Sequence, residues 1–371
     1  MLMFVANDQD KSVLAADAHH KITYTCPGCG QSVILRQGQM RLSHFAHHAG
    51  ADCHLFSEGE TKAHLAGKTR IFNWCRQNHL AVKLEAYLPR LKQRPDILVY
   101  WHHHWTAIEF QCSPISFEKL VERTQGYRSH GYKVWWILGP TYLAHKLTLE
   151  KVSKFAYFQK SLSLFISFYD PQNDQFLIRH HLTQDLFGKL KWQDYVFNPS
   201  KKAFTELFHQ GGKQKPNFKQ DSYREAVLLQ HQLLGRYSDA RLKRVQFICY
   251  THHLNLAGCP WIVHDQNFIL PTGKKIPLEV KIEFLLKLQL WQKQFVSYSL
   301  LATWYREVTE GNPFQLANVT RPQLNIELNF QQFLQNLLSD HVLKTVQKQY
   351  QIMVLPRWYT DITQKLRHFP D

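Results

Sequence analysis

The chain has 371 residues, with 45 Lys and Arg against 29 Asp and Glu, which gives a formal net charge of +16. A hydrophobic fraction of 44% and an aromatic fraction of 13% exclude a disordered or collagen-like polypeptide. No apolar run approaches the ~20 residues of a membrane-spanning helix. The basic excess therefore predicts a polyanionic partner such as DNA, with interleaved aromatic side chains as stacking surfaces.

The first third of the chain predicts a Cys- and His-rich module followed by an α/β domain. Residues 20–56 contain the Cys and His cluster. After it, the spacing of apolar residues predicts alternating helices and strands. In chain order these are a helix over 57–79, strands over 81–88, 95–101 and 105–111, a helix over 116–130, and a buried strand over 133–138.

The remainder of the chain has a weaker pattern. Residues 160–180 predict two strands around an Asn173-Asp174 turn, and from about residue 221 the pattern is mainly helical, including 276–309 and 331–350. We therefore expect three parts. These are a zinc-finger-like module over 1–56, an α/β domain over 57–145, and a basic, mainly α-helical C-terminal region over 146–371.

The Cys and His cluster has the composition of a structural zinc site. Cys26 and Cys29 form a C-x2-C turn, and His44, His47 and Cys53 follow it. Structural Zn²⁺ takes four such ligands, so five candidates compete for four places, and His47 with either Cys53 or His44 completes the set. The alternative is a pair of free buried thiols with surface histidines. Because the seven cysteines have no framework spacing, they favour a reducing, cytoplasmic compartment.

Two acidic residues predict a second metal centre. Asp96 begins one strand, while Glu109 and Gln111 lie on one face at the end of the next. Antiparallel pairing around the His102–His104 turn brings Asp96 beside Glu109. Two such carboxylates can hold Mg²⁺ or Mn²⁺, which lowers the pKa of a water for attack on a phosphodiester. The alternative is an ordinary exposed Asp and a strand-end Glu.

Further polar residues flank this pair. Glu60, His64 and Lys68 follow at i, i+4 and i+8 on the preceding helix, and so form one polar face that points toward the centre. Arg123, on the helix after the second strand, either reaches a scissile phosphate or pairs with neighbours on a solvated face. A second cluster, Cys249, His252, His253 and Cys259, has loose spacing, and we interpret it as a packed loop rather than a metal site.

The order of elements resembles the PD-(D/E)XK nuclease fold, an α/β fold with a mixed central sheet. The resemblance implies that the domain over 57–145 is nuclease-like. The residues that correspond to its motif are Arg94-Pro95-Asp96 and Glu109-x-Gln111. Gln111 occupies the position where this family usually has a lysine that orients or activates the attacking water. The resemblance implies a Mg²⁺- or Mn²⁺-dependent deoxyribonuclease in which Asp96 and Glu109 bind the metal and Gln111 positions the water. The missing lysine favours a non-catalytic DNA-binding adaptor instead.

A closer resemblance, dense over residues 20–140, is to the CoiA competence proteins. The segments that carry it are Cys26-x2-Cys29 with His44-Phe-Ala-His47, Glu60-Thr-x-x-His64-x3-Lys68, Arg94-Pro95-Asp96-Ile97, Ile108-Glu-Phe-Gln-Cys-Ser-Pro-Ile-Ser116, and Glu122-Arg123-x3-Tyr127 before Trp135-Trp136-Ile137-Leu138. The resemblance implies a cytoplasmic factor of natural transformation. Such a factor acts on incoming single-stranded DNA during recombination, alongside a RecA-type recombinase and other competence factors.

Overall fold

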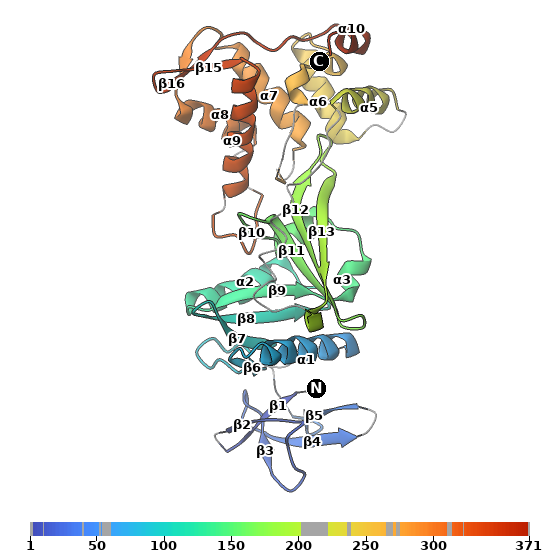
Figure 1. Ribbon diagram of the computed structural model, residues 1–371, viewed down its shortest axis with the longest axis vertical. Helices are drawn as coiled ribbons and strands as arrows, with labels where there is room; N and C mark the ends of the chain where they lie inside the picture. Colours follow the sequence, from blue (N-terminus) through green and yellow to red (C-terminus); the bar gives the residue numbers. More distant parts are fainter. Residues whose placement is uncertain are drawn as a thin grey trace.

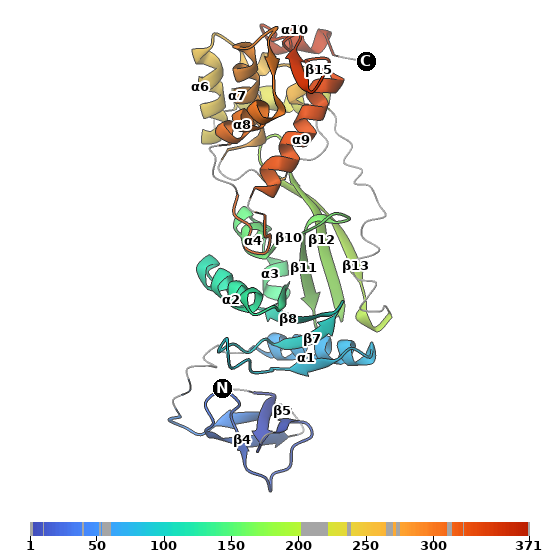
Figure 2. The ribbon, with the colours of Figure 1, turned by 90° about the vertical axis from the view of Figure 1, so that its left-hand side faces the viewer.

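Three parts of the molecule lie one above another along its long axis (Figure 1). A small β module is at one end, an α/β domain is in the middle, and a mainly helical domain is at the other end, an arrangement that Figure 2 shows from the side. The computed structural model describes residues 3–9, 11–38, 41–51, 53, 61–201, 222–235, 239–264, 270–271, 275–309, 314–321 and 323–369.

The N-terminal module is a five-stranded antiparallel sheet with the order β2-β1-β3-β4-β5. Its strands are β1 (Val5–Asp8), β2 (Lys11–Leu14), β3 (Tyr24–Thr25), β4 (Ser32–Gly38) and β5 (Arg41–His47). Its core is small and contains several short side chains, including Ala6, Ala15 and Ala18, around Tyr24 and Phe45. A core of this size rarely stabilises a fold alone, and small domains of this kind usually add a metal or disulfides.

The middle domain is built on an eight-stranded mixed sheet with the main order β13-β12-β11-β9-β8-β7-β6, and β10 pairs with β11 beside it. β9 runs parallel to both β8 and β11, and the other pairs are antiparallel. The strands are β6 (Val82–Leu84), β7 (Ile97–Trp101), β8 (His104–Gln111), β9 (Lys133–Leu138), β10 (Tyr157–Gln159), β11 (Ser163–Asp170), β12 (Gln175–Gln184) and β13 (Leu190–Phe197).

Helices cover both faces of this sheet. They are α1 (Lys62–Gln77), α2 (Phe117–Ser129), α3 (Pro140–Ala144) and α4 (Leu149–Phe155), and a 3-10 turn, η2 (Pro199–Lys201), follows β13. Ile71 and Phe72 of α1 share one core with Ile97 and Ile108. On the opposite face, Leu120 of α2 belongs to a core with α4 and the other side of β7, β8 and β9. The continuous apolar run of β7 is explained by this burial on both faces.

The boundary expected at residue 145 is wrong, because the sheet continues beyond it. β11 pairs in parallel with β9, and β12 and β13 extend the same sheet to Phe197. The short helices α3 and α4 and the three-residue strand β10 intervene before this continuation, so the local sequence carries no linker that marks a boundary. The first helix also begins later than expected, at Lys62, where the Thr61 hydroxyl caps it by accepting a hydrogen bond from the His64 N–H at 3.2 Å.

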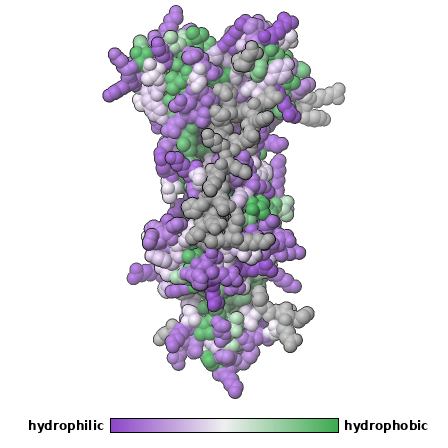
Figure 3. Space-filling view, in the orientation of Figure 1, coloured by the Kyte–Doolittle hydropathy of each residue, from purple (hydrophilic) through white to green (hydrophobic). Residues whose placement is uncertain are grey.

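The C-terminal domain is mainly helical and has its own core. Its elements are α5 (Ser222–Leu234), α6 (Ala240–Thr251), η5 (Leu256–Gly258), η6 (Trp261–Val263), α7 (Pro277–Gln289), β14 (Phe295–Val296), α8 (Tyr298–Val308), α9 (Leu324–Ser339), β15 (Leu343–Val346), β16 (Gln349–Ile352) and α10 (Ile362–Arg367). Among the residues that Figure 3 colours by hydropathy, hydrophilic ones predominate on this face, with small apolar patches between them. None of the described helices has the length and hydropathy needed to cross a bilayer.

The helix predicted over 331–350 is wrong in its second half. α9 ends at Ser339, and His341 has a φ of 55°, which ends the helix in a turn. β15 and β16 then form a hairpin, with Gln347 and Lys348 at positive φ in the turn. The apolar spacing of this stretch fits both a helix and a short hairpin, so the turn residues decide between them.

Candidate functional site

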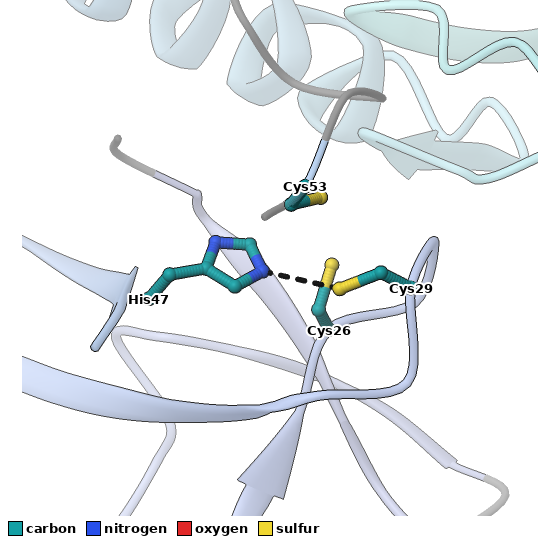
Figure 4. Close-up of side chains that lie close together, drawn as sticks. All are labelled: Cys26, Cys29, His47 and Cys53. Carbon is teal, nitrogen blue, oxygen red and sulfur yellow. Dashed lines mark hydrogen bonds between the residues drawn. The ribbon is translucent and has the colours of Figure 1, made fainter. Parts of the chain in front are cut away.

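Four potential metal ligands meet in the N-terminal module (Figure 4). Cys26 and Cys29 lie in the loop between β3 and β4, His47 ends β5, and Cys53 follows it. One ligand atom from each side chain lies within 4.8 Å of all the others. The Sγ of Cys29 and the Nε2 of His47 are 3.3 Å apart, which suits two vertices of a zinc tetrahedron with ligand bonds of about 2.0–2.3 Å. This Cys3His donor set fits structural zinc.

His44 is the one candidate of the five that does not join this group. It lies three residues before His47 on β5, and an odd spacing in a strand directs two side chains to opposite faces. The structure therefore selects Cys53 for the fourth place. Burial raises the pKa of the Cys26 thiol to about 12, so metal binding would release its proton.

The Asp96 carboxylate lies just before β7 and is contacted from α1. His64 Nε2 is 3.1 Å from Asp96 Oδ2, and the Lys68 ammonium lies 3.7 Å from Oδ1. The backbone N–H of Phe110 also donates to Oδ2 at 2.8 Å. Burial opposes the charged form, but these three contacts outweigh it and hold the pKa of Asp96 well below its usual range. Asp96 therefore favours its ionised form.

Lys68 joins Asp96 to a buried carboxylate that the sequence did not single out. The Lys68 side chain is fully buried and pairs with Glu85, which is 1% exposed. Arg94 donates to the other oxygen of Glu85 at 3.0 Å, and so does the backbone N–H of Phe4 at 2.9 Å. Burial raises the pKa of Glu85, but Lys68 and Arg94 outweigh it and lower the pKa overall.

A glycine allows α1 to approach closely enough for these contacts. A Cβ built on Gly67 would meet the ring of Phe110 at 2.0 Å, so only glycine fits between the helix and β8. The Phe110 ring also stacks on His64, with ring centroids 5.9 Å apart. Gly67 thus allows α1 to lie close enough to β8 for His64 and Lys68 to contact Asp96.

Glu109 lies on β8 and is held from the other side of the sheet, by α2. The guanidinium of Arg123 donates to its Oε1 at 2.6 Å, and the hydroxyl of Tyr127 donates to the same oxygen at 2.5 Å. Burial raises the pKa of Glu109; Arg123 lowers it, while the charge of Asp96 adds to the rise. The net result is a raised pKa for Glu109, whereas the pKa of Asp96 is lowered. Glu109 is therefore protonated more readily than Asp96.

Asp96 and Glu109 occupy facing positions of the β7–β8 ladder, because Ile97 pairs with Ile108 in antiparallel register. Their side chains are nevertheless engaged by different helices on opposite faces of the sheet. Among the residues that the structure describes, Asp96 and Glu109 are not part of any group of three or more His, Cys, Asp or Glu side chains that could hold a metal ion. Two carboxylates in these positions have the donor chemistry for Mg²⁺ or Mn²⁺, but His64, Lys68 and Arg123 already contact them.

The remaining sequence candidates have other surroundings. The side-chain amide of Gln111 donates to the backbone carbonyl of Ser113 at 2.7 Å, in the segment that follows β8. Glu60 lies outside the described residues. Cys249 is buried, whereas His252 and His253 are exposed at the end of α6, so these three side chains do not gather. Cys249 belongs to α6, whereas Cys259 follows the short turn η5 and is buried, which agrees with a packed loop around Cys259 rather than a metal site.

The comparisons with known proteins agree with this arrangement. The family model described as "Competence protein CoiA, N-terminal domain" matches residues 6–56, and "Competence protein CoiA, nuclease-like domain" matches residues 60–212. The two matches are in chain order, and they correspond to the N-terminal module and the α/β domain of the structure. The chain belongs to the CoiA family. Its α/β domain is therefore the CoiA nuclease-like domain, and the match to residue 212 agrees with a sheet that continues past residue 145.

A curated relative is similar over part of the chain. Competence protein CoiA of Bacillus subtilis (strain 168) is 31% identical over 130 residues, which cover 34% of this chain and 35% of that protein. The match thus spans about a third of each CoiA sequence. No solved structure matches this chain.

Proposed function

We propose that this chain is a cytoplasmic DNA-processing factor of natural competence, whose nuclease-like domain hydrolyses phosphodiesters in incoming single-stranded or branched DNA. Asp96 and Glu109 would hold Mg²⁺ or Mn²⁺, which supplies an activated water and neutralises charge on the phosphate. The competence role follows from membership of the CoiA family. The net charge of +16 supports a nucleic-acid substrate.

The observation that carries the catalytic part is the position of Lys68. Gln111 replaces the lysine that the nuclease motif usually carries, and its amide is turned toward Ser113. Lys68 brings an ammonium to 3.7 Å from Asp96 from a different element, α1. A buried ammonium beside Asp96, also paired with Glu85, can stabilise negative charge that develops at this centre. His64, on the same helix, contacts Asp96 and is suited to move a proton.

The test is cleavage of single-stranded and branched DNA by the full chain with Mg²⁺ or Mn²⁺. We expect Asp96→Asn and Glu109→Gln to abolish cleavage, and Lys68→Met to lower it by a factor of about 100 or more. Two surface variants on the same helices serve as controls, Lys62→Met on α1 and Glu122→Gln on α2, and both should cleave like the wild type. Equal activity in all five variants would exclude this centre.

A second candidate is a non-catalytic DNA-binding adaptor that recruits a RecA-type recombinase or other competence factors. The observation that favours it is that both carboxylates already have cationic partners, Lys68 and Arg123. In that case the wild type binds DNA without cutting it, Asp96→Asn leaves binding unchanged, and added salt weakens binding steeply. DNA binding by the wild type without cleavage, with either metal, selects this function.

A further inference from the structure

Helix α6, in the C-terminal domain, presents two large aromatic side chains to solvent. It buries Leu242, Val245 and Cys249. On its other side Phe247 is 65% exposed and Tyr250 is 76% exposed, the two most exposed aromatic side chains among the residues that the structure describes. The helix lies at the outer edge of the helical end of the molecule in Figure 2. Rings that stay so exposed are typical of a binding surface rather than of a core.

Basic side chains share this surface. Lys243, Phe247 and Tyr250 follow at i, i+4 and i+7, which places them in one stripe along the helix. Lys243 is exposed and begins the stripe, and Arg244 lies next to it. The sequence of α6 contains three basic residues and no acidic one. Charge and exposed rings therefore occur together on one helix face.

In the part of the chain that the structure describes, acidic side chains pair with the two arginines beside the stripe, Arg241 and Arg244, but not with Lys243. Arg244 donates to Glu279 of α7 at 2.6 Å, and that carboxylate is itself buried. Arg241 pairs with Asp239, the residue that caps the helix. No described acidic side chain forms an ion pair with Lys243. The exposed cation of the stripe is thus available to an anionic ligand.

We propose that the Lys243–Phe247–Tyr250 stripe of α6 binds single-stranded DNA, with a phosphate at Lys243 and bases stacked on the two rings. Unpaired bases expose flat faces that stack on aromatic side chains, and each stacked base contributes to affinity in any sequence. Paired bases in a duplex do not offer these faces. The proposal shares with the proposed function only its ligand, DNA, because the stripe contains none of the residues assigned to cleavage.

Binding of a labelled oligo-dT by the full chain tests this, measured by fluorescence anisotropy without added divalent metal. We expect the Phe247→Ala/Tyr250→Ala double variant to bind about tenfold more weakly or worse, because both stacking faces are lost. Phe247→Tyr, which keeps the ring, should bind like the wild type. Phe295→Ala on β14 removes another ring that is 51% exposed and serves as the matched control.

The lysine gives an independent readout. Lys243→Ala should weaken oligo-dT binding and reduce the slope of log affinity against log salt by about 0.7, the value for one phosphate contact on a single strand. Wild-type affinity in the double aromatic variant would overturn the proposal and leave α6 as a surface for a protein. Cleavage by the Asp96 centre is scored separately, so either result can fail without the other.

Discussion

At the scale of single residues, the zinc site offers the sharpest test, because the structure chooses between two candidate ligands. We expect the purified chain to hold one Zn²⁺, and Cys53→Ala to lose most of it, since a three-ligand set binds far less tightly than a closed one. His44→Ala should retain the metal, because His44 lies outside the Cys3His group. Metal content by mass spectrometry after dialysis decides between them. Retention by Cys53→Ala with loss in His44→Ala would reverse the assignment.

A buried ion pair gives a second prediction at this scale. Glu85→Gln removes the charge that faces the fully buried ammonium of Lys68 and the guanidinium of Arg94. Removing one partner of a buried ion pair typically costs about 3–5 kcal/mol. Lys68 keeps the Asp96 carboxylate at 3.7 Å, so we expect a fall at the lower end of this range, about 3 kcal/mol in the free energy of unfolding from urea titrations. Glu150→Gln, which removes a 72% exposed carboxylate paired with Lys154, is the control and should change little.

These residues also mark how far sequence reasoning reaches. His64, Lys68 and Asp96 could be found because they stand in short motifs with helical or strand spacing. Glu85 could not, because it follows a three-residue strand at a φ of 49° and its partners lie 17 and 9 residues away. Only the folded chain brings Lys68 and Arg94 to it. The one available signal was a Glu within the strand predicted over 81–88.

At the scale of elements, β12 contains a bulge that makes stability depend on pH. The register shifts between His180 and Thr183, His181 has a φ of 51°, and the two His Nδ1 atoms are 2.7 Å apart. Burial, and then the neighbouring His180, lower the pKa of His181 from 6.5 to about 4. Between these two values the unfolded chain takes up a proton that the folded chain does not, so stability falls as the pH drops from 7 toward 4.

Because of this shift in the pKa of His181, we expect the free energy of unfolding to fall by about 2 kcal/mol between pH 7 and pH 5. His181→Asn removes the titrating group and keeps a residue that tolerates positive φ, so its urea midpoint should fall less over the same range. The difference between the two proteins isolates the bulge from any effect of acid on the zinc module. A variant that loses stability in parallel with the wild type would contradict this explanation.

The strand order of the sheet was only partly predictable from local patterns. β7 and β8 could be paired in advance, because the His102–His104 segment is a short turn between two strand-like runs. The structure confirms a hairpin, in which His102 and His103 both take positive φ, as in a type I′ turn. The parallel pairing of β9 with β11 could not be predicted. The helices that connect these strands, α3 and α4, are too short to give a clear helical pattern in the sequence. Pairing between strands that are distant in the sequence depends on how their apolar side chains pack in the folded domain, which local patterns do not show.

At the scale of the whole molecule, the N-terminal module is joined to the nuclease-like centre by its first residues. The backbone N–H of Phe4 donates to Glu85, and the Phe4 ring lies 5.2 Å from the Lys68 ammonium. Phe4 and Val5 also belong to the core that contains Ile71 of α1. Loss of the zinc module's fold would therefore remove one hydrogen bond from Glu85 and uncover part of the core beneath α1.

This predicts that zinc controls the order of α1 as well as that of the N-terminal sheet. After removal of zinc by a chelator, hydrogen exchange should accelerate in β3 to β5, because their small core depends on the metal. It should also accelerate in α1, where Lys68 and His64 lie, while α9 in the separate C-terminal core stays protected. Cys26→Ser should reproduce this pattern without chelator, and His44→Ala should not. Unchanged protection of α1 beside a molten N-terminal sheet would show that the contacts of Phe4 do not couple the two domains.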